Sequence, residues 1–123
     1  AIRRALSMAQ ENILNRVRKF RGDRSFPKLE HKIALLVDDG LASGFTMLVA
    51  AESAKKSNPE EIVVGVPTAS LSSAELVARS VDELVCLNIR SGPTFAVADA
   101  YQEWHDLSDE EVMEWLNKAS CRG

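Results

Sequence analysis

Residues 33–46 are the part of this chain that most constrains its fold. Their first part, Ile33 to Val37, is an unbroken apolar run, too short for a helix of its own and suited to a strand buried on both faces. Two adjacent carboxylates, Asp38 and Asp39, end the run, and a loop of small residues follows. A helical pattern begins at Phe45. The stretch therefore predicts a strand, a loop and a helix in direct succession.

The loop and the two carboxylates suit different parts of a ligand. Small residues leave backbone N–H groups uncovered, and at the N-terminus of a helix these groups attract an anion. Adjacent carboxylates accept hydrogen bonds from two neighbouring hydroxyls, or hold a hard cation. A ligand with a vicinal diol at one end and a phosphate at the other, such as ribose 5-phosphate, would satisfy both. The structural alternative is that the two aspartates only begin a turn.

Helical and strand patterns alternate along the rest of the chain. Apolar residues spaced three and four apart predict an amphipathic helix over residues 2–20, and Gly22 follows its end. Further helices are expected over 45–57 and 72–80 and from Ser108 onward, the last two opened by capping boxes with Glu75 and Glu111. Strands are expected over 32–37, 61–66 and 83–89, and residues 94–107 as a loop with a helical turn.

This order predicts an α/β fold: a three-layer α/β/α arrangement around a parallel sheet of at least three strands. A chain of 123 residues suits one such domain. Ligands of parallel sheets bind at the carboxyl ends of the strands. Three loops are expected there, over residues 38–46, 67–70 and 88–93.

Composition and charge narrow the classes of function. The net charge of −3 gives no basic field for nucleic acid or an anionic membrane, so neither is an expected partner. Cys86 lies in an apolar run and Cys121 near the end, which suggests a reduced, cytoplasmic protein rather than a disulfide scaffold. The chain begins at Ala1 without an initiator Met, which indicates either processing or a piece of a longer protein.

The segment from Val37 to Thr46 closely resembles the phosphoribosyl-pyrophosphate (PRPP) motif of type I phosphoribosyltransferases. That motif is a hydrophobic strand, two acidic residues, two small or apolar residues and then Thr-Gly-x-Thr. Here Ser43 replaces the usual Thr and keeps its hydroxyl, and Phe45 stands where a small residue is more common. Weaker similarity over most of the remaining chain implies the carboxyl-terminal part of such a transferase.

The resemblance implies roles for particular residues. Asp38 and Asp39 would be the catalytic carboxylates, holding the ribose 2- and 3-hydroxyls directly or through Mg²⁺. The phosphate would lie on the loop that follows, and Phe95 would contact a base. The implied substrate-binding residues are Asp38, Asp39, Gly40, Ala42, Ser43, Gly44, Phe45, Thr46 and Phe95, with Asp38 and Asp39 as metal ligands.

Two parts of the family pattern are absent before Ile33: the Arg-Gly-Gly pyrophosphate loop and a basic residue on the following hairpin. The resemblance thus implies a domain without its N-terminal strands, which transfers a phosphoribosyl group to a nitrogenous base in a longer protein. The alternative is a non-catalytic module that senses a ribose phosphate or serves a structural role. Without those strands the strand over 32–37 is an open edge, which favours a homodimer or coverage by the first helix.

Other ligand chemistries fit less well. A receiver-like phospho-acceptor site needs acidic residues on more than one strand and a Lys after the third. An ordinary P-loop needs Gly-Lys-Ser/Thr, which the sequence lacks. His31 and His105 have no metal-ligand spacing with each other or with a cysteine.

Overall fold

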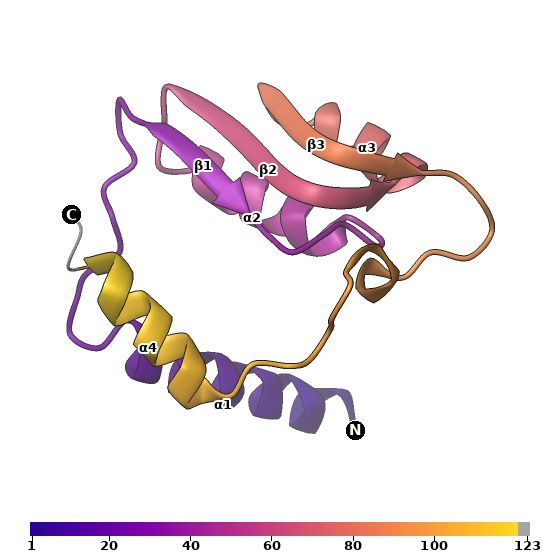
Figure 1. Cartoon of the computed structure of the whole chain (residues 1–123). Coiled ribbons are helices and arrows are strands. Elements are labelled where there is room, and N and C mark those ends of the chain that lie inside the picture. Colours follow the sequence, from indigo (N-terminus) through magenta and orange to yellow (C-terminus); the bar gives the residue numbers. More distant parts are fainter. Residues whose placement is uncertain (121–123) are drawn as a thin grey trace. The chain divides into compact units, whose positions relative to one another are not determined.

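The computed structural model describes residues 1–120, and the prediction about Cys121 lies outside them. Two compact units form: residues 28–104 make one, and residues 1–27 with the segment from His105 onward make the other. Each unit is described by itself, and the expectation of a single domain stays a prediction. The elements are α1 (Ile2–Phe20), β1 (Ile33–Val37), α2 (Phe45–Lys55), β2 (Glu61–Ser70), α3 (Leu71–Ala78), β3 (Glu83–Arg90), the 3-10 helix η1 (Val97–Ala100) and α4 (Asp109–Ser120) (Figure 1).

The larger unit is built on a three-stranded sheet in the order β1-β2-β3, and both strand pairs are parallel. Ile33 of β1 pairs with Glu61 of β2, and Val64 of β2 pairs with Leu84 of β3. Helices α2 and α3 form the two crossovers between these strands. The α/β class and the parallel sheet are therefore confirmed, and the structure has β2 as the central strand.

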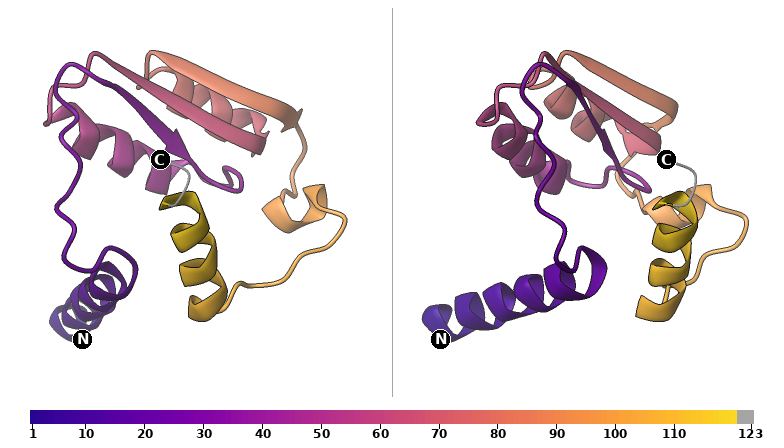
Figure 2. Two further views of the ribbon diagram at one scale, coloured as in Figure 1. Left: turned by 60° about the vertical axis from the view of Figure 1, so that its left-hand side comes forward. Right: turned by 90° about the vertical axis from the view of Figure 1, so that its left-hand side faces the viewer.

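Both crossover helices cover the same face of this sheet (Figure 2). The core lies between them and β2, and includes Val64 and Val77, which are fully buried. The other face of the sheet carries exposed apolar side chains, among them Val37 at 70% and Leu87 at 84% exposure. The prediction that β1 is buried on both faces is wrong within this unit, because α2 covers one face only. A second helical layer stays a prediction.

Strand β2 is longer than its apolar run suggested and continues to Ser70. Residues 67–70, expected as a loop, pair instead with β3 up to Arg90, so residues 88–90 are strand as well. Val66 pairs with Cys86 and Thr68 with Asn88, and Pro67 between them has no N–H to donate. The pattern hid this extension, because proline and small polar residues are typical of loops.

The N-cap of helix α3 lies two residues before the predicted cap, Ser72. Ser70 is the N-cap, and its hydroxyl accepts a hydrogen bond from the Ser73 N–H at 3.3 Å. Ser72, the predicted cap, is exposed and lies within the first turn. The observed cap precedes the predicted one because β2 runs directly into α3. Ser70 is therefore both the last residue of β2 and the N-cap of α3.

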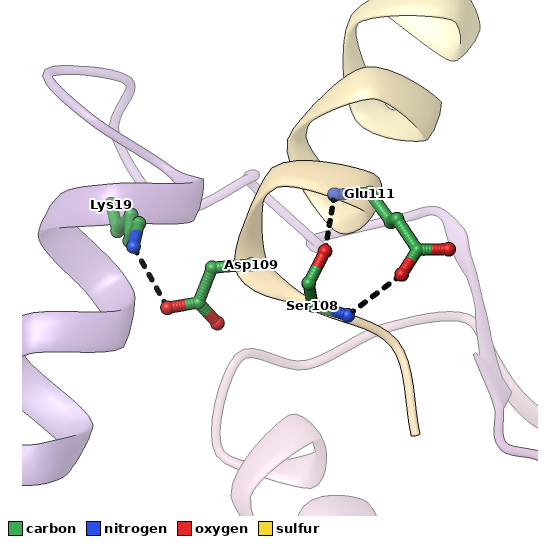
Figure 3. Close-up of polar contacts among 4 residues, drawn as sticks. All are labelled: Lys19, Ser108, Asp109 and Glu111. Atoms are coloured by element: carbon green, nitrogen blue, oxygen red, sulfur yellow. Dashed lines mark hydrogen bonds and ion pairs between the residues drawn. The ribbon is translucent and has the colours of Figure 1, made fainter. Parts of the chain in front are cut away.

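The smaller unit pairs α1 with α4. Lys19 Nζ lies 2.8 Å from Asp109 Oδ2 at the start of α4 (Figure 3). The predicted capping box is confirmed: the Ser108 N–H donates to Glu111 Oε1 at 3.1 Å, and the Glu111 N–H donates to the Ser108 hydroxyl at 3.2 Å (Figure 3). The hydrogen bond from the Ser108 N–H, followed by the effect of the Ser108 hydroxyl, holds the pKa of the Glu111 carboxyl below its ordinary value.

The apolar stripes of this unit are largely exposed. No residue of α1 is buried, and Ile2 and Ile13 of its predicted stripe lie open. In α4, Val112 is half-buried but Trp115 is exposed. Two helices alone have too little surface to bury both stripes. Within residues 1–120, no helix combines the length and apolar character that a membrane span requires.

The position of the α3 cap yields a test. Replacing Ser70 by Ala removes the cap together with the other hydrogen bonds of its hydroxyl, and should lower the free energy of unfolding by at least about 1 kcal/mol. Ser72→Ala is the matched control and should cost less than about 0.5 kcal/mol, as at other exposed sites. Urea unfolding followed by circular dichroism measures both, and equal losses would contradict the assignment of the cap to Ser70.

Candidate functional site

The candidate site lies where the chain leaves β1, and backbone hydrogen bonds fix it to the end of β2. The Leu41 N–H donates to the Thr68 carbonyl at 3.0 Å, and the Ser70 N–H donates to the Leu41 carbonyl at 3.2 Å. Leu41 thereby forms a parallel bridge with Ala69, although it lies outside β1. These hydrogen bonds thus hold the loop after Asp38 and Asp39 against the end of β2, as one further residue pair beyond β1.

Two serines near the start of α3 hold the same loop. The Ser70 hydroxyl donates to the Ala42 carbonyl at 3.0 Å, and the Ser73 hydroxyl donates to the Leu41 carbonyl at 3.0 Å. Ser73 is buried, and its hydroxyl also lies within hydrogen-bond distance of the Ser70 hydroxyl and carbonyl. The sequence placed Ser70 in an expected loop and Ser73 at a helix start, because their hydroxyls give no signal of a contact with a loop so distant in sequence.

Gly44 lets the loop turn into α2. Its φ of 85° is in the left-handed region, and a Cβ at this position would lie 3.2 Å from the Ser73 Cβ. The Phe45 N–H donates to the Ser43 hydroxyl at 3.3 Å. Among the described residues, none accepts a hydrogen bond from the N–H groups of Ala42, Ser43, Gly44 or Thr46. These N–H groups lie at the N-terminus of α2 and are unpaired, as an anion site requires.

The loop and the first turn of α2 enclose a cavity of about 220 Å³. Seven of the predicted residues meet there: Asp38, Asp39, Gly40, Ala42, Ser43, Gly44 and Thr46. Leu41, Met47 and Val97 complete the lining and were not predicted. Phe45 and Phe95 do not line this cavity; Phe45 is exposed and Phe95 is half-buried. The contact of Phe95 with a base stays a prediction.

The two carboxylates carry the negative charge of this cavity. The Asp39 N–H donates to Asp38 Oδ1 at 2.9 Å, which holds the Asp38 side chain against the loop backbone. Burial raises the pKa of Asp39 above its ordinary value, and the neighbouring charge of Asp38 adds to the effect. Both side chains remain accessible to solvent, so a ligand can reach them.

The segment of residues 97–101 packs against the loop, and Val97 is its residue in the cavity lining. A Cβ on Gly40 would lie 2.7 and 2.8 Å from the two Val97 methyl groups and 3.0 Å from the Thr68 Cγ2. Glycine is therefore required here by close packing against η1. The Tyr101 hydroxyl donates to the Asp39 carbonyl at 2.6 Å. Both Val97 and Tyr101 were missed at this site, since aromatic and aliphatic residues mostly signal packing.

A cation would have Asp38 and Asp39 as its protein ligands. Across the described part of the chain, no group of three or more Asp, Glu, His or Cys side chains could hold a metal ion. Magnesium does not need such a group, because it is commonly held by one or two carboxylates together with oxygens of the substrate. The donor set fits a magnesium ion shared with a bound ligand, and does not fit a metal cage built by the protein alone.

Comparisons with known proteins agree with this geometry. The model of the phosphoribosyl transferase domain family matches residues 3–104. Two Mycobacterium tuberculosis proteins, from strains CDC 1551 and H37Rv, carry the name "Putative phosphoribosyl transferase" and are each 34% identical over 104 residues, which is 85% of this chain. The chain spans 23% of the length of these relatives.

A solved structure extends the likeness to the fold. The crystal structure of TT1426 from Thermus thermophilus matches with a TM-score of 0.81 and 27% identity, over 94% of this chain and 55% of that one. The AQ2163 protein of Aquifex aeolicus shares the fold over 54% of this chain and 33% of that one, with a TM-score of 0.50 and 24% identity. The chain belongs to the phosphoribosyl transferase domain family.

The interaction between the two carboxylates yields a pH prediction. Because the folded state raises the pKa of Asp39, ionising Asp39 costs stability, so stability should fall as pH rises from about 3.9 through the higher folded pKa. Asp38→Asn keeps an acceptor for the Asp39 N–H but removes the neighbouring charge. The variant should lower the pKa of Asp39 and reduce this fall, as measured by side-chain ¹³C NMR titration and urea unfolding.

Glu83→Gln is the control for that titration, since Glu83 is an exposed carboxylate at the amino end of β3, away from the loop. It should leave the pKa of Asp39 unchanged. An Asp39 titration curve that Asp38→Asn does not move would contradict the charge coupling.

The close approach at Gly40 yields a second prediction for this site. Gly40→Ala forces a methyl group against Val97 and should cost about 1–3 kcal/mol of unfolding free energy. Combining it with Val97→Ala should recover part of that loss, because the two changes share one contact. Urea unfolding of the single and double variants measures the coupling. Simple additivity would contradict packing of η1 on the loop.

Proposed function

We propose that this domain binds the ribose 5-phosphate part of PRPP in the cavity after β1, as one half of a phosphoribosyltransferase active site. The observation that carries the proposal is the meeting of two carboxylates and the open N-terminus of α2 in one cavity. Membership of the phosphoribosyl transferase domain family supports it.

The phosphate end of the ligand would lie on the first turn of α2. The unpaired N–H groups of residues 42–44 and of Thr46 supply donors, and the Ser43 and Thr46 side chains line the same cavity. Helix α2 has eleven residues, enough for its aligned peptide dipoles to favour an anion at its N-terminus. No lysine or arginine is needed for this half of the site.

The diol end would lie on Asp38 and Asp39. Each carboxylate can accept a hydrogen bond from one ribose hydroxyl, or hold Mg²⁺ that also binds the ligand. Bound Mg²⁺ would neutralise charge on the pyrophosphate. Burial and, after it, the charge of Asp38 raise the pKa of Asp39, and a bound cation or hydroxyl donor would oppose both effects by stabilising the ionised carboxylate.

In the full-length protein the reaction would transfer the phosphoribosyl group to a nitrogenous base. The base nitrogen forms a bond to the anomeric carbon of the ribose, and the carbon–oxygen bond to pyrophosphate breaks, so that pyrophosphate leaves with the electron pair. This chain's residues would hold the sugar in position, which accounts for much of catalysis in such transfers. The pyrophosphate needs cations or further donors from elsewhere, since none of the described residues that line this cavity is basic.

The proposal is tested by NMR titration of the ¹⁵N-labelled chain with PRPP and Mg²⁺. The amides of residues 42–46 and those of Asp38 and Asp39 should shift at millimolar ligand or below. Asp39→Asn should abolish the magnesium-dependent part and leave inorganic phosphate binding intact, since phosphate uses only the helix N-terminus. Amides over 42–46 that stay still in the wild-type chain would overturn the proposal.

Turnover in the full-length protein separates a transferase from a sensing module. With candidate bases, a transferase should release pyrophosphate, and Asp39→Asn should abolish that activity without unfolding the protein. Ser72→Ala is a suitable control, because Ser72 lies outside the cavity lining. Ligand binding without turnover, across all bases, would favour the sensing module.

A further inference from the structure

The segment after β3 packs against the part of the cavity that carries Asp38 and Asp39. Val97 of η1 lines the cavity and packs on Gly40, the residue directly after the two carboxylates. The next contact comes from Tyr101, whose hydroxyl reaches the carbonyl of Asp39 across sixty-two positions of sequence. This segment is thus tied to the loop at two consecutive residues, by packing at Gly40 and by a hydrogen bond at Asp39.

The hydrogen bond from Tyr101 is short and has one possible direction. Its oxygen–oxygen distance is 2.6 Å, and a backbone carbonyl can only accept, so the phenol donates. Burial raises the pKa of Tyr101, and the charges of Asp39 and Asp38 raise it further, so the phenol keeps its proton at neutral pH. The ring packs edge-on against Trp104, with centroids 5.2 Å apart.

Together with a second hydrogen bond, the one from Tyr101 restrains the backbone of Asp39 on both sides. On one side, the Asp39 N–H is held by Asp38 Oδ1. On the other side, the Asp39 carbonyl is held by Tyr101. These two contacts restrain the peptide units before and after Asp39, and with them the direction of its Cα–Cβ bond. Gly40, which follows, has no side chain to restrict the loop by itself.

We propose that Tyr101 is a positioning residue: its hydroxyl sets the backbone at Asp39 so that the two carboxylates face a ribose diol. The inference rests on the proposed function, since it concerns the same cavity. It adds that recognition of the sugar depends on the segment after β3, whereas recognition of the phosphate depends on the loop, α2 and the serines that hold the loop. Tyr101 contacts the Asp39 carbonyl and does not line the cavity.

The test compares ligands that differ only in the sugar. Tyr101→Phe removes the hydroxyl and keeps the ring that packs on Trp104. By isothermal titration with Mg²⁺ present, it should raise the Kd of ribose 5-phosphate about 2- to 10-fold, the range for one hydrogen bond. The Kd of inorganic phosphate should stay within about 2-fold of the wild-type value. Discrimination between ribose 5-phosphate and 2-deoxyribose 5-phosphate should shrink.

Trp104→Phe is the matched control, because it alters the same aromatic contact without removing the hydrogen bond to Asp39. It should leave all three affinities unchanged. Equal weakening of phosphate and ribose 5-phosphate by Tyr101→Phe would mean a general loosening of the site and overturn the inference. An unchanged affinity for ribose 5-phosphate would also overturn it.

A second measurement needs no substitution. Tyr101 is the one tyrosine of the sequence, so 3-fluorotyrosine labelling gives a single ¹⁹F resonance. Ribose 5-phosphate with Mg²⁺ should shift it and inorganic phosphate should not. A wild-type chain that binds phosphate but not ribose 5-phosphate would overturn the proposed function and this inference together. Sugar binding without a ¹⁹F shift would overturn this inference alone.

Discussion

The backbone pairing between Leu41 and the end of β2 is the constraint on which the candidate site depends. Two hydrogen bonds, to Thr68 and from Ser70, extend the sheet beyond the carboxylates. The acidic pair therefore lies between two fixed points, the end of β1 and the bridge at Leu41. A loop with one free end would lose more conformational entropy on binding a ligand. The length of β2 matters for this reason, since a strand ending at Val66 would leave Leu41 without a partner.

The two halves of the cavity are held by different parts of the fold. The helix N-terminus is held by Gly44 and by serines of α3, which are local to the β1–α2–β2–α3 order. The backbone at Asp39 and Gly40 is contacted by the segment from Val97 to Tyr101, which follows β3. Phosphate and sugar would thus be recognised by structures that form from separate lengths of chain. Such a division allows the sugar half to vary while the phosphate half stays the same.

The sequence was sufficient for the parallel α/β class and for the positions of most elements, because apolar runs and helical periodicity are strong local signals. The family resemblance singled out seven residues that line one cavity, and their role in binding stays a prediction. The sequence was insufficient at Pro67, where long-range pairing overrode a loop-like composition. The roles of Ser73 and Tyr101 were also hidden, because each depends on a partner far away in the sequence. The exposure of β1 could not be foreseen, since an apolar run does not reveal how many faces are covered.

The one-sided cover of the sheet in residues 28–104 has a thermodynamic consequence. The heat capacity change of unfolding comes mainly from apolar surface that water reaches only in the unfolded chain. Side chains such as Leu35, Val37 and Leu87 already contact water in the folded unit and contribute little to it. The unit should therefore unfold with a small heat capacity change and a low dependence on denaturant for its length. Its free energy of unfolding would vary little with temperature, and the plot of that free energy against temperature would have a broad, shallow maximum.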